Sequence, residues 1–181
     1  MKAKILKGKK VSLRLPEEDD FAEYSELGRR SEKFHRGLVK VFQTRDGFLR
    51  FVERCGADVN SGFLVIRRED NAIAGTIMLS QIFHGALCSA YLGYWLGAGF
   101  TGRGLMTEAV ALVLRHAFRD LKLHRVEANV QPENIPSIAV LKRNGFSQEG
   151  YSPRYLKVGG KWRDHERWAM LKEDWSAMRS R

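Results

Sequence analysis

The chain has 181 residues and a formal net charge of +10, with 44% hydrophobic and 29% charged residues. These values exclude a disordered or collagen-like chain, and no apolar stretch approaches the roughly 18 residues of a membrane span. The length favours one domain over 1–181. Two cysteines, Cys55 and Cys88, and the lack of an apolar leader favour a cytoplasmic protein with no disulfide framework.

The first half of the chain predicts an alternation of strands and helices. Apolar and polar residues alternate towards the end of 8–15, which indicates a strand. Pro16 and the four acids after it open a helix, because proline and negative charge both suit a first helical turn. A second helix follows Thr44. Three β-rich runs then predict strands at 63–66, 72–82 and 89–96.

The second half predicts a parallel crossover followed by a hairpin. A glycine-rich stretch at 97–104 precedes a long amphipathic helix, a strand at 125–130 and a shorter helix from Asn134. A hairpin over 146–171 turns at Gly159-Gly160, and a short helix follows Asp174. We therefore predict an α/β (α+β) domain with a mixed sheet, in which 89–130 forms a β–α–β unit.

The glycine-rich stretch carries the first chemical signal. It lies between a strand and a helix N-terminus, where main-chain N–H groups and the helix dipole favour a phosphate. Arg103 adds a cation between Gly102 and Gly104. The dinucleotide pattern of spaced glycines fails because residue 107 is threonine, and the Walker pattern is absent. A flexible connection remains the alternative.

Several motifs together resemble one family. They occur in a fixed order at tight spacing: Leu92–Leu96, Phe100–Met106, Glu108-Ala109, Asn134-x-x-Ser137, Asn144–Gly150 and Gly159–His165. This order resembles the GCN5-related N-acetyltransferase (GNAT) superfamily. Within it, the motifs resemble the ribosomal-protein N-terminal acetyltransferases. Among these, the segment Gly159–His165 is similar to the group that acetylates the N-terminal alanine of ribosomal protein S5. The resemblance implies a mostly antiparallel sheet flanked by helices, with a parallel β–α–β unit that binds acetyl-CoA. No metal is expected, because His84, His116, His124 and His165 do not have the spacing of metal ligands.

The resemblance also implies positions for the cosubstrate. The main chain of Trp95 and Leu96 would bind the pantetheine, and Asn134 and Ser137 would lie near it and the thiol. A second set would surround the pyrophosphate: Gly102, Arg103, Gly104, Leu105 and Met106. A structural alternative remains open for Asn134 and Ser137, because asparagine is a good N-cap and a hydroxyl three residues later serves the first turn.

The catalytic residues of some relatives are replaced in this chain. Asn129 stands where those relatives have a glutamate base, Leu141 where they have a tyrosine acid, and Leu156 where closer relatives have a glutamate. We therefore predict direct attack in a ternary complex, with Ser137 hydrogen-bonding or protonating the departing sulfur. A main-chain N–H within 94–96 would polarise the carbonyl. Candidates for orienting the acceptor or relaying its proton are Tyr151, Tyr155 and Asp164.

The expected acceptor is a protein N-terminus. An α-amino group has a pKa of about 7.7–8.0, so a useful fraction is neutral at pH 7, whereas a lysine amine titrates near 10.4. Two alternatives remain: a small amine such as a polyamine, amino acid or antibiotic, and a non-catalytic basic module on RNA or ribosomes. The glycine loop does not account for the basic run from Lys2 to Arg14. That run fits contact with a ribosome or RNA, and neither a membrane nor specific DNA is expected.

Overall fold

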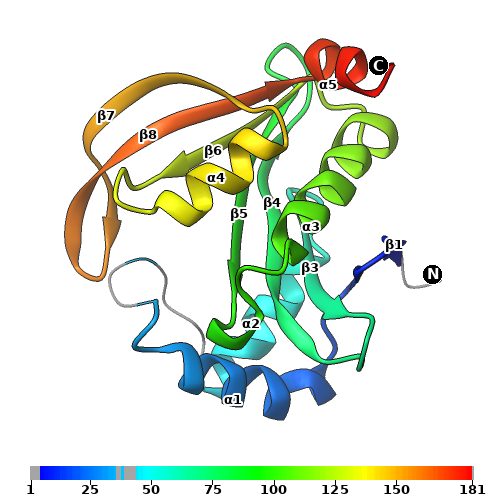
Figure 1. Cartoon of the computed structure of the whole chain (residues 1–181), viewed down its shortest axis with the longest axis vertical. Helices are drawn as coiled ribbons and strands as arrows, with labels where there is room; N and C mark the ends of the chain where they lie inside the picture. Colours follow the sequence, from blue (N-terminus) through cyan, green and yellow to red (C-terminus); the bar gives the residue numbers. More distant parts are fainter. Residues whose placement is uncertain (1–4, 36–37, 39–43, 181) are drawn as a thin grey trace.

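The computed structural model describes residues 5–35, 38 and 44–180. Its centre is one eight-stranded sheet in the order β1-β2-β3-β4-β5-β6-β8-β7 (Figure 1). The strands are β1 (Leu6–Lys7), β2 (Val11–Arg14), β3 (Asn60–Arg67), β4 (Ile73–Phe83), β5 (Ser89–Leu96), β6 (Arg125–Val130), β7 (Ser147–Val158) and β8 (Lys161–Leu171). Neighbouring strands pair antiparallel except β5 and β6, which pair parallel. The predicted mixed fold and its β–α–β unit are confirmed.

Helices cover both faces of the sheet. They are α1 (Phe21–Ser31), α2 (Arg45–Cys55), α3 (Leu105–Arg115), α4 (Ile135–Arg143) and α5 (Lys172–Arg179). Successive strand residues point to opposite faces, so Leu64 and Ile66 pack with α1 and α2 in one apolar cluster. Phe63 and Val65 pack with α3 and α4 in the other and larger cluster.

Four features of the fold differ from the sequence prediction. The first predicted strand is interrupted by a turn, closed where the Gly8 N–H donates to the Val11 carbonyl at 2.8 Å, and a further short strand, β1, precedes it. The strand predicted at 63–66 is the centre of the longer β3. The last helix begins at Lys172 rather than after Asp174.

The fourth difference is a π-helical turn over His116–Asp120 at the end of α3. It places the buried His116 between two partners. The distances are 3.0 Å from Nε2 to the Ser61 Oγ and 2.8 Å from Nδ1 to an Asp120 carboxylate oxygen. The sequence predicts that α3 continues as a regular helix through these residues. It contains no signal for the π-helical turn, because the interaction with Ser61 joins residues 55 positions apart.

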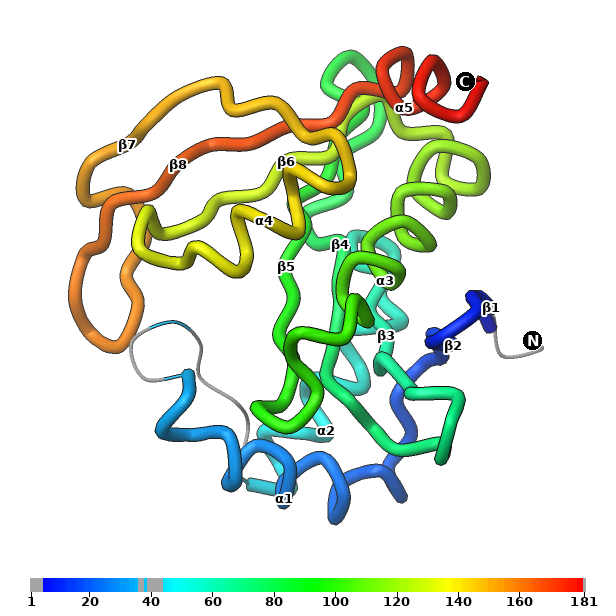
Figure 2. Tube along the Cα trace, viewed as in Figure 1, coloured from blue at the N-terminus to red at the C-terminus, as the bar shows by residue number. Residues whose placement is uncertain are grey.

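The sheet opens between its two parallel strands. Only Ser89–Tyr91 of β5 pair with Arg125–Glu127 of β6, although β5 continues to Leu96 and β6 to Val130. Beyond the paired segment the two strands diverge, and α4 lies beside the opening (Figure 2). Main-chain groups along the diverging ends therefore have no partner strand between them, which makes this opening the first place to look for a ligand.

Candidate functional site

The opening between β5 and β6 is lined on the β5 side by main-chain groups. The Gly97 N–H donates to the Ala74 carbonyl of β4 at 2.8 Å. Hydrogen-bonded and non-hydrogen-bonded pairs alternate along an antiparallel ladder, so the Trp95 main chain faces β4. The main-chain N–H and carbonyl groups of Tyr94 and Leu96 face the opening. Of the two residues predicted to bind pantetheine through their main chain, Leu96 is the one so directed.

Two buried polar side chains from the end of α1 hold this end of β5. His35 Nε2 donates to the Leu96 carbonyl at 2.7 Å, and Ser31 Oγ accepts the Ala98 N–H at 3.1 Å. Burial lowers the pKa of His35, so its imidazole stays neutral near pH 7. The His35 ring also contacts the buried Trp95 edge-on, with centroids 5.5 Å apart. No sequence motif signals these contacts, which join residues more than sixty positions apart.

A pair of hydroxyl groups lies beside the opening on the α3/α4 face. Tyr94 Oη, from β5, is 2.8 Å from Ser137 Oγ and 3.2 Å from the Ser137 carbonyl of α4. Burial raises the pKa of Tyr94 to about 12, so the phenol remains protonated over the range in which enzymes work. Sequence reasoning selected Ser137 but not its partner. The pair links β5 to α4 beside the opening.

The opposite face of the opening presents different groups. Alternation along β6 directs Asn129 to the face shared with Trp95, away from Ser137. Its Oδ1 is buried without a hydrogen-bond partner among the described residues. A buried orphan acceptor points to a ligand donor, but an amide is no proton acceptor at neutral pH. Leu141, which replaces the acidic tyrosine of some relatives, is fully buried in the core.

The glycine loop has the geometry of an anion site. Gly102 and Gly104 both have φ of +75°, a region that side chains rarely adopt, and a Cβ on Gly102 would meet nothing within 4 Å. The side chains of Leu105 and Met106 are buried in the core, so their main-chain N–H groups are what they offer to a ligand. Orphan N–H groups at the start of α3 and the exposed Arg103 fit a pyrophosphate.

Asn134 has the structural role that the sequence left open. Its Oδ1 accepts the Ser137 N–H at 3.3 Å, which caps α4. The cap fixes the first turn of the helix and with it the position of the Ser137 hydroxyl. Capping and ligand binding are compatible here, because the cap uses only Oδ1 of the Asn134 side chain and not its Nδ2.

A carboxylate joins the basic N-terminal run to the glycine loop. Glu108 Oε2 accepts the N–H groups of Lys10 and Val11 at 2.7 and 2.9 Å, and Oε1 accepts that of Lys9 at 2.7 Å. Lys10 Nζ then donates to the Arg103 carbonyl at 3.0 Å. The helix dipole alone accounts for an acid in a first helical turn, so no local pattern in the sequence points to this contact. The structure places part of the basic run at the loop.

The β7–β8 hairpin carries the predicted acceptor-side residues. Tyr151 Oη and the Arg154 N–H both donate to Asp164, the second at 2.7 Å, and these bonds lower the pKa of Asp164. Asp164 thus holds the irregular part of β7 and is a weak base. Tyr155 projects from that segment and contacts the buried His165, with ring centroids 6.2 Å apart. Tyr155 also contributes to the raised pKa of Tyr91, after burial and the Glu127 carboxylate.

The structure therefore places the predicted residues in three sets. Ser137 lies with Tyr94 on the α3/α4 face, and Asn129 faces the opposite side, where Tyr155 approaches Tyr91. Tyr151 and Asp164 belong to the hairpin itself. Within the described ranges, no group of three or more histidine, cysteine or acidic side chains could hold a metal. None of the helices described is long and apolar enough to cross a membrane.

Comparison with known proteins matches this arrangement to one family. The model of the acetyltransferase (GNAT) domain matches residues 10–147. A probable N-acetyltransferase of Bacillus subtilis, YjcK, is 36% identical over 178 residues, which are 94% of this chain and 98% of the relative. The [ribosomal protein uS5]-alanine N-acetyltransferase of Escherichia coli is 38% identical over 108 residues, or 60% of this chain and 56% of that protein.

Solved structures agree with the family match. Mycobacterium smegmatis RimJ in complex with CoA-disulfide superposes with a TM-score of 0.83 at 32% identity, over 94% of this chain and 86% of that one. The ribosomal-protein-S5-alanine acetyltransferase of Vibrio fischeri gives a TM-score of 0.84 at 26% identity, over 95% and 98%. The chain belongs to the GNAT family of acetyltransferases.

Proposed function

We propose that this acetyltransferase transfers the acetyl group of acetyl-CoA to the α-amino group of a protein N-terminus, most specifically the N-terminal alanine of an S5-like ribosomal protein. The observation that carries the proposal is the opening between the diverging ends of β5 and β6. One face of the opening carries Tyr94 and Ser137, and the other carries Asn129 and Tyr155. The two relatives named for S5-alanine acetylation support the acceptor. We place the reaction in the cytoplasm, in one domain, with no metal.

Acetyl-CoA fits the α3/α4 face of the opening. Its pyrophosphate would be held at 102–106 by main-chain N–H groups and Arg103, and its pantetheine by the main chain of β5 at Tyr94 and Leu96. Bound there, acetyl-CoA supplies an activated thioester. A β5 N–H aimed at the thioester oxygen would stabilise the charge that develops on it during attack.

The Tyr94–Ser137 pair would serve the leaving group. When Tyr94 donates to Ser137 Oγ, at 2.8 Å, the proton of Ser137 is left free to turn to the departing sulfur. The high pKa of Tyr94 keeps it a donor throughout. The acceptor amine would approach from the face of Asn129 and Tyr155, where Asn129 Oδ1 is an available acceptor for an amine N–H. An α-amine is partly neutral at pH 7, so no carboxylate base is needed to start the attack, which positioning would favour. The proton that the nitrogen loses on forming the amide would pass to water, and Ser137 would regain from water the proton that it gives to the departing thiolate.

The proposal is tested by CoA release with three matched acceptors: an alanine-starting peptide, the same peptide with a blocked N-terminus and an internal lysine, and a polyamine. We expect release with the free N-terminus alone, at a rate that rises with pH as the α-amine becomes neutral. Release with the polyamine alone would identify a small-amine enzyme. In cells that lack the gene, an unchanged mass of the S5 N-terminal peptide would refute the S5 assignment.

A further inference from the structure

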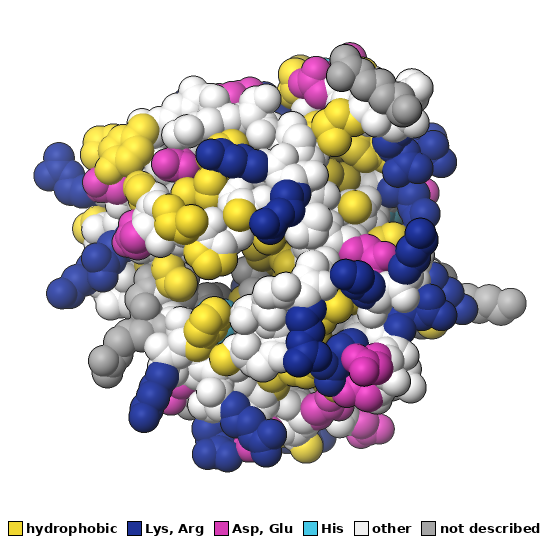
Figure 3. Space-filling view, viewed as in Figure 1, with side chains coloured by type: hydrophobic (Ala, Val, Ile, Leu, Met, Phe, Trp, Pro, Cys, Tyr) yellow, Lys and Arg dark blue, Asp and Glu magenta, His cyan; other side chains and the backbone are white. Residues whose placement is uncertain are grey.

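A basic cleft lies beside the glycine loop. It is a cavity of about 540 Å³ lined by Lys9, Lys10, Arg67, Arg68 and Arg103, with Glu69 and Leu105. Arg103 belongs to the loop and Leu105 is the first residue of α3, so the cleft and the loop share a wall. Figure 3 shows Lys and Arg side chains gathered on the side of the molecule where β1, β2 and the start of α3 lie.

Most of the positive charge in this cleft is not neutralised. Arg67 pairs with Asp70 at 2.5 Å and covers the Phe100 ring at 4.6 Å. Arg68 and Lys10 instead donate to neutral carbonyl groups, at 2.8 and 3.0 Å. Within the described part of the chain, none of Lys9, Lys10, Arg68 and Arg103 forms an ion pair with a carboxylate. A cation that donates only to a neutral carbonyl keeps its full charge, so these side chains can still attract an anion.

The two lysines are held in place by a built contact. Three main-chain N–H groups of their turn converge on the Glu108 carboxylate. A Cβ on Gly8 would come within 2.7 Å of the Glu108 Cδ, so any larger residue there would have to displace this carboxylate. Arg68 NH1 binds the Gly8 carbonyl from the other side. This fixes the main chain that carries both lysines beside the loop, and the Lys10 side chain is directed to the loop by its hydrogen bond to the Arg103 carbonyl.

We propose that this cleft binds the 3′-phosphate of acetyl-CoA, with Lys9 and Lys10 as its main partners; this rests on the proposed use of acetyl-CoA. The cosubstrate carries a pyrophosphate and one further phosphate monoester, which is close to dianionic at pH 7. The loop accounts for the pyrophosphate. The adjoining cleft offers the ammonium groups of two lysines, which bind phosphates as point charges.

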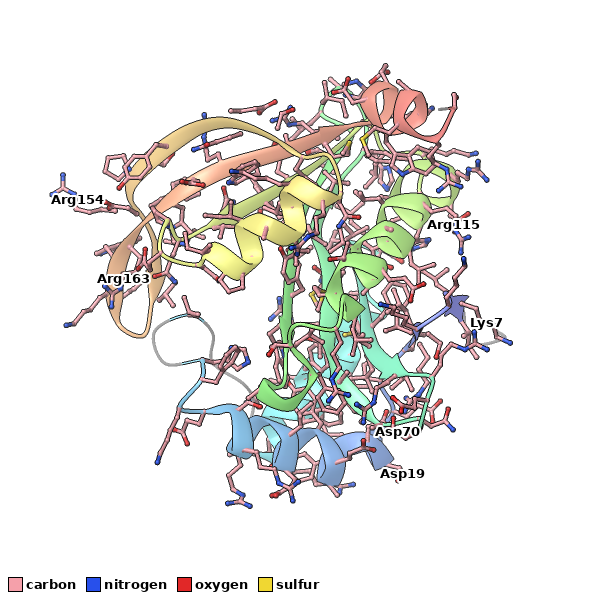
Figure 4. The ribbon with its side chains drawn as sticks, viewed as in Figure 1. Lys7, Asp19, Asp70, Arg115, Arg154 and Arg163 are labelled. Atoms are coloured by element: carbon pink, nitrogen blue, oxygen red, sulfur yellow. The ribbon has the colours of Figure 1, made fainter. Side chains whose placement is uncertain are left out.

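The experiment measures affinities for CoA and 3′-dephospho-CoA by calorimetry. The variants are Lys9→Met, Lys9→Met with Lys10→Met, and Lys161→Met as a control in the β7–β8 turn. Figure 4 labels Arg154 and Arg163 on that hairpin, on the opposite side of the molecule from Lys7 and Asp70. The wild type should bind CoA about tenfold more tightly than 3′-dephospho-CoA, as expected for a charge-assisted contact.

The ratio of the two affinities is the decisive readout. In the double variant we expect this ratio to fall below about threefold. Lys9→Met should give an intermediate ratio, and Lys161→Met should keep the ratio of the wild type. A disturbed loop would weaken both ligands equally and leave the ratio unchanged. An unchanged ratio in the double variant, or a wild type that does not discriminate, overturns the proposal. A wild type that binds neither ligand refutes the use of CoA, and thus the proposed function, by a separate observation.

Discussion

Replacing Tyr94 by phenylalanine removes one hydroxyl and keeps the ring that packs beside β5. The variant loses the 2.8 Å hydrogen bond to Ser137 Oγ and the 3.2 Å contact with the Ser137 carbonyl. A neutral hydrogen bond contributes about 1 kcal/mol, so we expect kcat to fall about fivefold. Ser137→Ala removes the proton donor itself, and general acid catalysis contributes at least about a hundredfold. KM for acetyl-CoA should change little in either variant, because both hydroxyls act on the leaving sulfur.

The double variant separates a coupled pair from two independent residues. If Tyr94 acts only by directing Ser137, Tyr94→Phe with Ser137→Ala loses no more than the roughly hundredfold of Ser137→Ala alone. Independent residues would lose the product, about five-hundredfold. Steady-state kinetics with a saturating alanine-starting peptide distinguishes these values. Ser176→Ala, which removes a helix hydroxyl from α5, is the matched control and should keep full kcat. A multiplicative loss would falsify the directing role.

Four further predictions follow from individual contacts. Glu108→Ala should lower the free energy of unfolding by about 2 kcal/mol, because three main-chain N–H groups lose a charged acceptor; urea unfolding checks this, and a change below about 0.5 kcal/mol would contradict it. Cys55 is buried and its pKa is raised to about 12, so a thiol reagent at pH 8 should modify Cys88 alone until urea unfolds the chain; two fast thiols in the native protein would contradict this. Gly104→Ala should weaken CoA binding and cost about 1–2 kcal/mol of stability, since φ is +75°; calorimetry measures the first and thermal unfolding the second. Arg67 lowers the pKa of Asp70 to about 2, so that pair stabilises the fold above about pH 4 and is lost towards pH 2; Asp70→Asn should flatten the acid limb of stability over that window.

Local patterns in the sequence predicted most of the fold. Each helix except α5 has a start signal or an apolar stripe that can be read over a few residues, and the Gly159-Gly160 turn defines the β7–β8 hairpin. The predictions were wrong where contacts with residues far away in the chain determine the local conformation. The π-helical turn depends on Ser61, far away in the chain, and the turn at Gly8 depends on Glu108. Periodicity carries no information about such partners.

The candidate site divides in the same way. The glycine loop and Ser137 could be selected because their residue types recur at fixed spacing. Tyr94 and His35 could not, because a tyrosine on a strand and a histidine after a helix are both common in cores. Their roles arise from contacts across 43 and 61 residues. Asn129 could be placed by counting, but only the structure shows that its oxygen is buried without a partner in the described chain.

The Glu108 contact also constrains the order in which parts of the chain can fold during synthesis. The main-chain groups that it holds lie 97 to 99 residues earlier in the chain. At about 5–20 residues per second of synthesis, the lysines of this turn wait about 5–20 s before their acceptor has even been made. For that interval a strongly basic segment leaves the ribosome, itself a polyanion, without the carboxylate that later holds it, whereas its partners in β3 are made earlier. The pairing of β2 with β3 can therefore form before the turn docks on α3.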